Sequence, residues 1–574
     1  MSAAQPHAFQ PRVTLPQRLG PAALALLLWA LVCAALAGFW WHQAQPTPLA
    51  AVPEPATRGA PLDCLSYAPF RFPDASPLIP GSAVTRARIE ADLRLLRPLT
   101  RCVRTYGISQ GLDQVPAVAR ELGMRVKLGL WLGRDPVHNQ AEIERGVALA
   151  NANADVVDLL IVGNEVLLRH ELTPEQLARA LRQARAGSWV PVSYADVWAF
   201  WQRNAALADE VDVVGVHILP YWEDQPVAIE QAAAYVIDTA GAMRQLFAGK
   251  PVWVAETGWP AVGRQRGPAV PGALEQARFV RELLVLLAQT DGQVNWIEAF
   301  DQPWKRAFEG AMGAGWGFFS ADGVQRVRFT GPVPGDRVAQ AALLGLLVGG
   351  GVGGVLAILL AALKRRAWLE YLHAAPVAAV LVSMAVVQWH ASQTWDRTPL
   401  EQALSAVLAL LSAAAAAAFA WPRTPLRWLA GLHTALLYAA ACAALVLWVD
   451  PRYRPLALWW FWAPTVAIGI RVVVSRVSRV PLVSRTPMES VTKPLPLPVL
   501  GMPCAARRRL RFLAAVTAVC ALGFALGEGL ANAQALAYAG VLLALAASAV
   551  IWSVSSPTQV AAASSSAGAA HSAA

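Results

Sequence analysis

The chain has 574 residues, of which 56% are hydrophobic and 15% are charged, and its mean hydropathy is +0.40. Soluble proteins usually carry about a quarter charged residues, so the composition excludes a wholly soluble chain and predicts membrane spans. The net charge of +10 does not indicate a nucleic-acid partner. The basic residues cluster beside the apolar runs, as they do in the cytoplasmic loops of membrane proteins.

The first apolar run, residues 21–41, follows a basic N-terminal segment, 1–20, that we expect in the cytoplasm. The run is long enough to cross a bilayer as a helix, and Trp40 and Trp41 suit its far interface. A cleaved signal peptide is the alternative, but the run is long for one. We therefore expect an uncleaved anchor, followed by a Pro- and Ala-rich linker over residues 42–61.

Residues 62–330 contain eight short apolar runs, most of them separated by helix-like stretches. The runs are 64–70, 102–106, 125–132, 157–166, 191–198, 211–221, 252–259 and 294–300. Runs that are apolar throughout fit parallel strands buried on both faces. Eight such units predict an α/β fold, a (β/α)8 TIM barrel. An open doubly wound sheet is the alternative, but no Gly-rich phosphate loop follows the first run.

Residues 339–554 predict a helical membrane domain with about seven more spans, making about eight in all. The spans are 339–363, 374–390, 402–421, 429–449, 456–474, 512–530 and 535–554. With the N-terminus inside, the basic loops, including a long one at 475–511, are cytoplasmic, and the barrel lies outside. The Ala- and Ser-rich tail, 555–574, is expected to be cytoplasmic and flexible.

Ionisable residues within or near the spans are few, which argues against a proton-coupled transporter. They are His373, His390, His433 and Glu528, and we expect most of them at the membrane interface. Cys64 and Cys102 fall on the first two predicted strands, so a disulfide between them is possible in an oxidising compartment. No cysteine spacing indicates a metal site, and no cofactor is expected.

Two glutamates stand out because each ends an apolar run. Glu165 lies near the end of the fourth run and Glu256 lies in the seventh, and we expect them to end the fourth and seventh strands. Barrel enzymes place their chemistry at the carboxyl ends of the strands, and strands four and seven face each other across the mouth. Two carboxylates that converge there can break a glycosidic bond, one as acid and the other as nucleophile.

The residues around the two glutamates resemble glycoside hydrolase family 17, the β-1,3-glucanases and related β-glucosyltransferases. The segments that carry the resemblance are Gly163-Asn164-Glu165 and Glu256-Thr257-Gly258-Trp259-Pro260. The resemblance covers about residues 62–330. It implies a (β/α)8 barrel in which Glu165 is the acid/base and Glu256 is the nucleophile of a retaining mechanism.

Other positions resemble substrate-facing sites of the same family. The expected substrate-binding residues are Tyr67, Arg104, Tyr106, Trp131, Asn164, Asp196, His217, Tyr221, Trp259, Glu298, Asp301 and Lys305. The aromatic residues have barrel packing as an alternative role, and the charged residues of 298–305 a structural ion-pair network. Many relatives have Glu where this chain has Gln302, which weakens a charge-based role there.

The membrane part resembles only a bacterial, membrane-anchored branch linked to β-(1,3)/(1,6)-glucan synthesis or remodelling. We therefore expect a multi-pass protein of the bacterial inner membrane with a periplasmic barrel, whose partners are β-glucan and the lipid bilayer. Transfer of the glucosyl unit to a glucan is favoured, because a scavenging hydrolase gains little from eight spans. Hydrolysis to water and a non-catalytic glucan-binding or export role are the alternatives. The sequence leaves the oligomeric state open.

Overall fold

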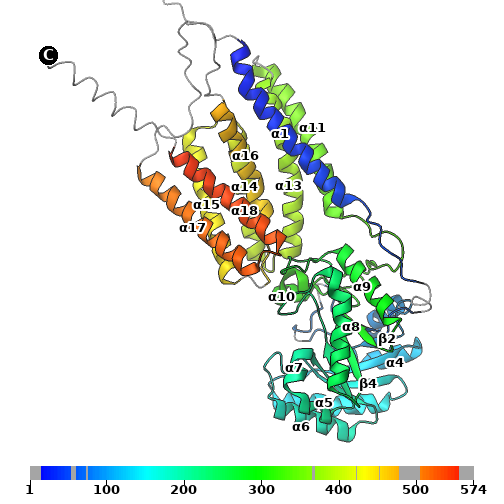
Figure 1. The fold of residues 1–574 in the computed structure, drawn as a ribbon. Helices are drawn as coiled ribbons and strands as arrows, with labels where there is room; N and C mark the ends of the chain where they lie inside the picture. Colours follow the sequence, from blue (N-terminus) through cyan, green and yellow to red (C-terminus); the bar gives the residue numbers. More distant parts are fainter. Residues whose placement is uncertain are drawn as a thin grey trace, which may run out of the picture.

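The computed structural model has two parts, a barrel and a bundle of long helices (Figure 1). The structure describes residues 15–53, 60–72, 75–79, 81–364, 369–421, 423–450, 453–477 and 504–554. The first 14 residues, most of the expected loop at 475–511 and the expected tail at 555–574 lie outside the described residues.

Eight parallel strands form the barrel, and β8 pairs with β1 to close it. The strands are β1 (Cys64–Ser66), β2 (Cys102–Arg104), β3 (Arg125–Leu130), β4 (Val157–Asn164), β5 (Val192–Val197), β6 (Val213–His217), β7 (Val252–Thr257) and β8 (Val294–Trp296). Nearly all of their residues are buried, which explains the apolar runs in the sequence. The closed barrel confirms the predicted (β/α)8 fold.

Helices surround the barrel in the expected alternation. They are α3 (Arg86–Leu96), α4 (Val115–Glu121), α5 (Pro136–Ala152), α6 (Pro174–Gly187), α7 (Trp198–Arg203), α8 (Ile229–Leu246), α9 (Ala273–Leu287) and α10 (Arg306–Gly313). Local sequence sets where they begin: Thr173 and Gln176 form a capping box at the start of α6. Their inner faces bury residues such as Leu93, Leu181 and Phe279 against the strands.

The last strand is shorter than predicted. Residues 294–300 were expected to be extended, but β8 ends at Trp296. Beyond it the chain leaves the β7 ladder, because the Ala299 N–H donates to the Ser66 carbonyl and Phe300 bridges to Phe319. The candidate residues from Glu298 to Lys305 therefore lie in a loop and in the short helix η3 (Pro303–Lys305), not on a strand.

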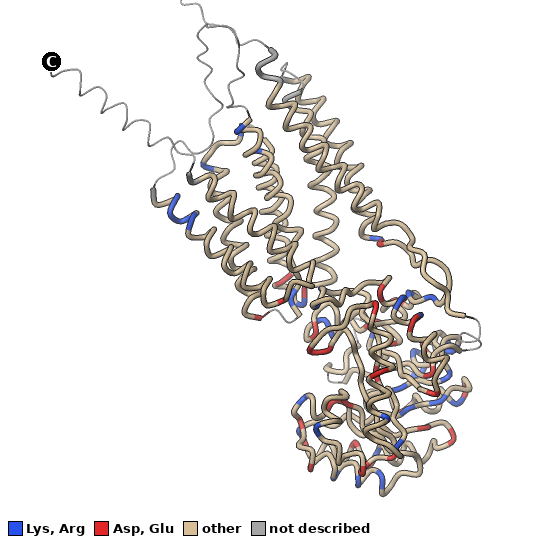
Figure 2. Tube along the Cα trace, in the orientation of Figure 1, with Lys and Arg blue, Asp and Glu red and all other residues tan. Residues whose placement is uncertain are grey.

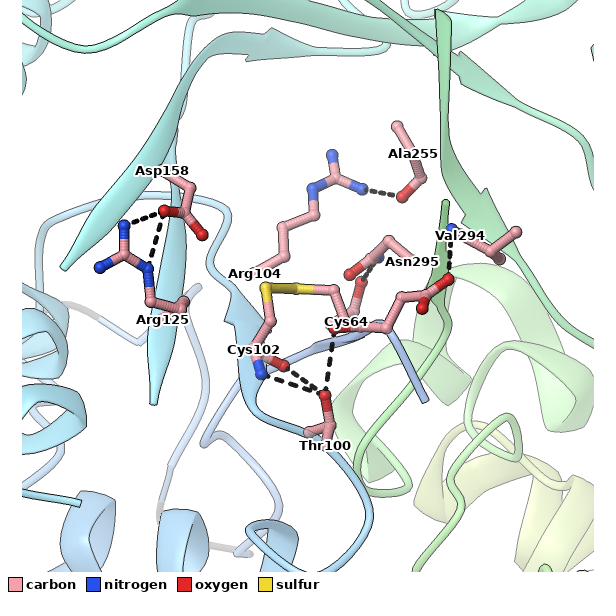
Figure 3. Close-up of a disulfide and its surroundings, with 11 residues drawn as sticks. Cys64, Thr100, Cys102, Arg104, Arg125, Asp158, Ala255, Val294 and Asn295 are labelled. Carbon is pink, nitrogen blue, oxygen red and sulfur yellow. Dashed lines mark hydrogen bonds and ion pairs between the residues drawn. A yellow bond between two sulfur atoms is a disulfide. The ribbon is translucent and has the colours of Figure 1, made fainter. Parts of the chain in front are cut away.

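A disulfide joins Cys64 to Cys102 at the starts of β1 and β2 (Figure 3). The Thr100 hydroxyl accepts a hydrogen bond from the Cys102 N–H at 3.1 Å. The disulfide therefore joins two neighbouring three-residue strands at their amino ends, opposite the end of the barrel at which the strands' carboxyl ends lie.

The second part is the helical bundle. Its helices are α1 (Leu15–Ala44), α11 (Arg337–Lys364), α12 (Leu369–Leu372), α13 (Ala374–Trp395), α14 (Pro399–Ala420), α15 (Leu426–Val449), α16 (Leu458–Val477), α17 (Cys504–Glu528) and α18 (Ala533–Val554). In the described part of the chain, eight of these are long and apolar enough to cross a membrane. This agrees with the predicted number of spans.

Close packing in the bundle depends on glycine in α11. Gly345, Gly349 and Gly353 share one face of the helix, and a Cβ on Gly349 would lie 2.4 Å from the Ala378 carbonyl oxygen of α13. Small residues at this spacing let two membrane helices approach closely. Near the end of α1, Trp40 and Trp41 were both expected at the membrane interface. Trp41 is exposed, whereas Trp40 is buried against Trp459.

The bundle is polarised by charge. Successive long helices alternate in direction, so α14, α16 and α18 begin at the end that faces the barrel, and α13, α15 and α17 begin at the far end (Figure 1). The far end carries Arg423, Arg427 and the group Arg507–Arg509, and basic residues are visible there in Figure 2. His433, which we expected near an interface, is instead fully buried in the bundle, 3.0 Å from the Ser548 hydroxyl.

Candidate active site

Glu165 and Glu256 meet at the mouth of the barrel, with His217 between them. One carboxylate oxygen of each glutamate and a ring nitrogen of His217 all lie within 4.8 Å of one another. Such a set could also ligate a metal ion. Arg104 already pairs with Glu256 at 2.8 Å, however, so an added cation would meet positive charge there.

The end of β4 is built to direct Glu165 into the mouth. The β4–β5 register shifts between Ile161 and Asn164, and Gly163 adopts a φ of +90°. Glu165 itself has a φ of +52°, in the left-handed region that side chains other than glycine rarely enter. Its N–H donates to the Ala195 carbonyl at 2.8 Å. This irregularity turns the chain so that the side chain leaves the strand direction, a common use of bulges beside active sites.

Glu256 is held by two donors from the segment that begins with β2. Arg104 donates to a Glu256 carboxylate oxygen at 2.8 Å, and the Tyr106 hydroxyl donates to the same oxygen at 2.9 Å. Arg104 also donates to the Ala255 carbonyl, shown in Figure 3, and to the Asn164 side-chain oxygen at 2.5 Å. One guanidinium therefore links the ends of β4 and β7.

A relay of hydrogen bonds sets the direction of the Tyr106 hydroxyl. The Asn295 amide donates to the Ser66 hydroxyl oxygen at 2.7 Å, and Ser66 and Tyr106 lie 2.8 Å apart. Because Ser66 accepts from Asn295, its own proton is free to point to Tyr106. Tyr106 then directs its proton to Glu256, as a group that stabilises the carboxylate form.

These contacts determine the protonation of Glu256. Burial would by itself raise the pKa of its carboxyl. Electrostatic interactions with His217 and Arg104 and the Tyr106 hydrogen bond together outweigh burial and lower that pKa below its ordinary value. Glu256 is therefore an ionised carboxylate at neutral pH, the state that a nucleophile requires.

His217 bridges the two glutamates from the end of β6. Its Nδ1 lies 2.9 Å from a Glu165 carboxylate oxygen, and its Nε2 lies 3.6 Å from Glu256. The imidazole is fully buried, and its Nε2 has no hydrogen-bond partner within the described ranges. Its geometry suits a group that orients Glu165 more than one that touches a ligand.

A second charged group lies beside the pair, after β8. The Lys305 ammonium contacts both Glu298 carboxylate oxygens, at 3.0 and 3.2 Å. Burial raises the pKa of Glu298 to about 7, although Lys305 opposes the rise. Burial also raises the pKa of Glu309 on α10, which interacts electrostatically with Lys305 and with both central glutamates. Lys305 is thus a cation shared among several carboxylates.

Three expected binding residues are in fact packing residues. Tyr67, Tyr221 and Trp259 have no exposed surface. The Tyr67 hydroxyl donates to Asp92 at 3.1 Å, the Tyr221 hydroxyl to the Arg264 carbonyl at 2.6 Å and the Trp259 indole to the Val270 carbonyl at 2.9 Å. Their polar atoms are thus all used within the protein, which leaves no face for a sugar.

Two expected acidic binding residues are also engaged internally. Asp196 accepts from the Tyr194 hydroxyl and from the Leu167 N–H, and burial raises its pKa to about 6. Asp301 forms an ion pair with Arg326 and accepts from the Gly317 N–H at 3.1 Å. Both carboxylates stabilise loops around the mouth instead of facing it.

Trp131 is the expected binding aromatic that remains open. Its side chain is 43% exposed at the end of β3, and the Arg169 guanidinium lies 4.0 Å from its ring centre. A partly covered indole beside the mouth offers an apolar surface on which a sugar ring can stack.

Sequence reasoning missed Asn295 and Glu309, since neither belongs to a recognisable segment and both act through other side chains.

Comparison with known proteins shows that the barrel is similar to glycoside hydrolases. Residues 64–317 match the BtgE/BtgC glycoside hydrolase domain. A glucan 1,3-beta-glucosidase of Schizosaccharomyces pombe is 29% identical over 232 residues, covering 38% of this chain and 72% of that protein. One from Candida albicans is 28% identical over 271 residues, covering 42% and 86%. The glycoside hydrolase family 17 beta-1,3-glucanosyltransferase from Rhizomucor miehei is 27% identical, with a TM-score of 0.41, and covers 47% of this chain and 97% of that one.

Proposed function

We propose, from the premise that residues 64–317 form a glycoside hydrolase domain similar to family 17, that this protein acts on β-1,3-glucan. It cleaves a β-1,3-glucosidic bond by a retaining mechanism and transfers the glucosyl unit to a glucan acceptor. Its relatives named as glucan 1,3-beta-glucosidases support the substrate class.

The spacing of the two glutamates is the observation that carries the retaining mechanism. One oxygen of Glu165 lies within 4.8 Å of one oxygen of Glu256. Retaining enzymes hold their carboxyls about 5–5.5 Å apart, whereas inverting enzymes leave about 6.5–9.5 Å for a water molecule. The short spacing favours direct attack by Glu256 on the anomeric carbon.

The contacts around each glutamate support separate roles. Glu256, held as a carboxylate by Arg104 and Tyr106, attacks the sugar and becomes covalently bound to it. Glu165 gives its proton to the departing oxygen and then removes a proton from the acceptor hydroxyl. In this second step the acceptor oxygen attacks the anomeric carbon and displaces the Glu256 carboxylate, so that both glutamates return to their starting states.

The acceptor distinguishes transfer from hydrolysis. We favour a glucan acceptor because the barrel is held against a helical bundle, an arrangement that suits synthesis or remodelling at a bacterial inner membrane. Hydrolysis to water by the same two glutamates is the alternative.

The products of the full-length protein with reduced laminari-oligosaccharides, followed by mass, test this choice. Longer products are expected; only shorter ones would exclude transfer.

Glu256→Gln should abolish turnover of every substrate. Glu165→Gln should slow oligosaccharides far more than aryl glucosides with good leaving groups, because only the former need a proton donor. Equal slowing of both substrate types would contradict the acid role.

A further inference from the structure

We propose that the helical bundle is a working part of the enzyme. In this inference, the barrel-facing ends of α17 and α18 and the α15–α16 connection hold the loops after β6, β7 and β8 in their active arrangement. Arg264 and Glu528 are positioning residues in it. The inference rests on the proposed glycosyl transfer for its kinetic consequence, but the loop contact itself is independent of that function.

A buried ion pair joins the loop after β7 to the end of α17. The Arg264 guanidinium lies 2.5 Å from a Glu528 carboxylate oxygen, and the two side chains are 7% and 9% exposed. Asn532 donates to the other Glu528 oxygen at 2.9 Å. A buried charge is costly unless it is paired and hydrogen-bonded, so this contact specifies one geometry for the loop.

The next residue of the same loop, Gln265, forms four hydrogen bonds with the α17–α18 connection and the start of α18. Its N–H donates to the Gln534 side chain at 2.8 Å, and its side-chain amide donates to the Ala531 carbonyl at 2.9 Å. Its carbonyl accepts from Asn532 at 3.0 Å, and its side-chain oxygen accepts from the Gln534 N–H at 3.2 Å. Backbone and side chain are therefore both fixed by the bundle.

A second contact involves α10 and the loop after β6. Gly310 has a φ of +69°, and a Cβ on it would lie 2.5 Å from the Tyr453 carbonyl oxygen in the α15–α16 connection. The Trp222 ring lies 5.8 Å from the Tyr453 ring and 6.4 Å from that of Trp316. A cavity at this contact, lined by residues that include Arg264 and Tyr453, has a volume of about 10 Å³, about the space for one water molecule. The surfaces are thus fitted to each other.

Both contacts lead directly to the candidate catalytic groups. The loop held through Arg264 follows β7, which ends one residue after Glu256, and the Arg264 carbonyl accepts from Tyr221 after β6. Lys305 immediately precedes α10 and binds Glu298. It is also one of the cations that lower the pKa of Glu256. A shift of α10 would therefore move a charge beside the nucleophile.

A simple tether does not require these features. The covalent connections through Ala44 and Arg337 are enough to keep the barrel at the membrane. The bundle additionally buries a charged pair and several loop hydrogen bonds on the catalytic side of the barrel. We infer that the bundle holds the groups at the barrel mouth in their reactive positions. Small displacements of reacting groups lower the reaction rate strongly, so this support should matter for catalysis.

The test compares full-length variants in detergent. Arg264→Ala and Glu528→Ala should each increase hydrogen exchange in residues 258–272 and lower kcat by about tenfold or more, with KM little changed. The charge exchange Arg264→Glu/Glu528→Arg should recover part of both effects. Glu401→Ala is the control, because it breaks a pair with Arg397 on the same side of the bundle. It should change neither property.

Several results would overturn the inference. Unchanged exchange in 258–272 would show that the bundle does not hold the loop, whatever happens to kcat. Increased exchange with wild-type kcat would show that holding the loop has no effect on the reaction. If the alanine variants do not fold, Glu528→Gln serves in their place, with the same two readouts. An inactive wild-type protein would refute the proposed function, while the exchange measurement would still test the contact.

Discussion

At the scale of single residues, the main feature of the site is the way in which neighbouring groups keep the Glu256 carboxyl ionised. Glu256 is buried, which would favour its protonated form, yet its neighbours reverse that preference. The arrangement depends on fully buried residues, since Asn295 and Ser66 determine where the Tyr106 proton points. The carboxylate form of Glu256 is therefore stabilised by a network of neighbours and not by the position of Glu256 alone.

Replacing Tyr106 by Phe tests this network. The change removes a donor to the carboxylate, so the pKa of Glu256 should rise. Because the ionised form is the reactive one, activity is lost as pH falls through this pKa. The acid limb of the kcat/KM profile should therefore move to higher pH, and kcat should fall about tenfold or more. Tyr235→Phe on α8 is the control and should leave the profile in place; an unmoved limb in Tyr106→Phe would contradict the assignment.

At the scale of elements, the barrel combines regular strands with irregular ends. Apolar runs predicted all eight strands, because burial on both faces leaves a clear pattern in the sequence. The ends were less predictable: β8 stops after three residues, and β4 shifts register just before Glu165. Such irregularities depend on which loop offers a hydrogen-bond partner, and no local pattern encodes that.

The disulfide between β1 and β2 should stabilise the barrel measurably. It closes a segment with a sequence separation of 38, for which chain entropy predicts about 4 kcal/mol. Reductant, or the double change Cys64→Ser/Cys102→Ser, should lower the melting temperature of the full-length protein. Cys442→Ser, at a free and exposed cysteine, should not. A reductant effect that persists in the double variant would assign the stabilisation elsewhere.

Sequence reasoning found the candidate catalytic pair but misjudged part of its surroundings. Glu165 and Glu256 sit in recognisable segments at strand ends. Tyr221 and Trp259 were expected to face a sugar, and their burial follows from contacts with Arg264 and Val270 that only the folded loops create. The contact between Arg264 and Glu528 spans 264 positions, so no spacing rule could have revealed it.

At the scale of the whole molecule, charge and helix direction favour one orientation of the bundle in a membrane. The end of the bundle far from the barrel carries Arg423, Arg427 and the group Arg507–Arg509. Basic residues stay on the cytoplasmic side. We therefore propose that this end faces the cytoplasm and that the barrel lies outside.

Labelling of single cysteines with an impermeant maleimide tests this orientation. In a background lacking the exposed Cys442 and also Cys504, spheroplasts should label Val324→Cys in the barrel and Asp450→Cys beside it. Ala505→Cys, at the far end of α17, should react only after permeabilisation. The reverse pattern would contradict the orientation.

The barrel leaves the bundle and returns to it at one place. Thr47 and Val333 pair through two backbone hydrogen bonds of 2.9 Å, and the helices they continue, α1 and α11, pack together. Because the barrel is inserted between two adjoining helices, it can be removed or exchanged without changing the path of the other membrane helices. This barrel, joined to a foreign bundle, would still be carried to the membrane, but Arg264 would lack the matched surface around Glu528. We therefore expect a hybrid with a foreign bundle to reach the membrane and yet turn over slowly.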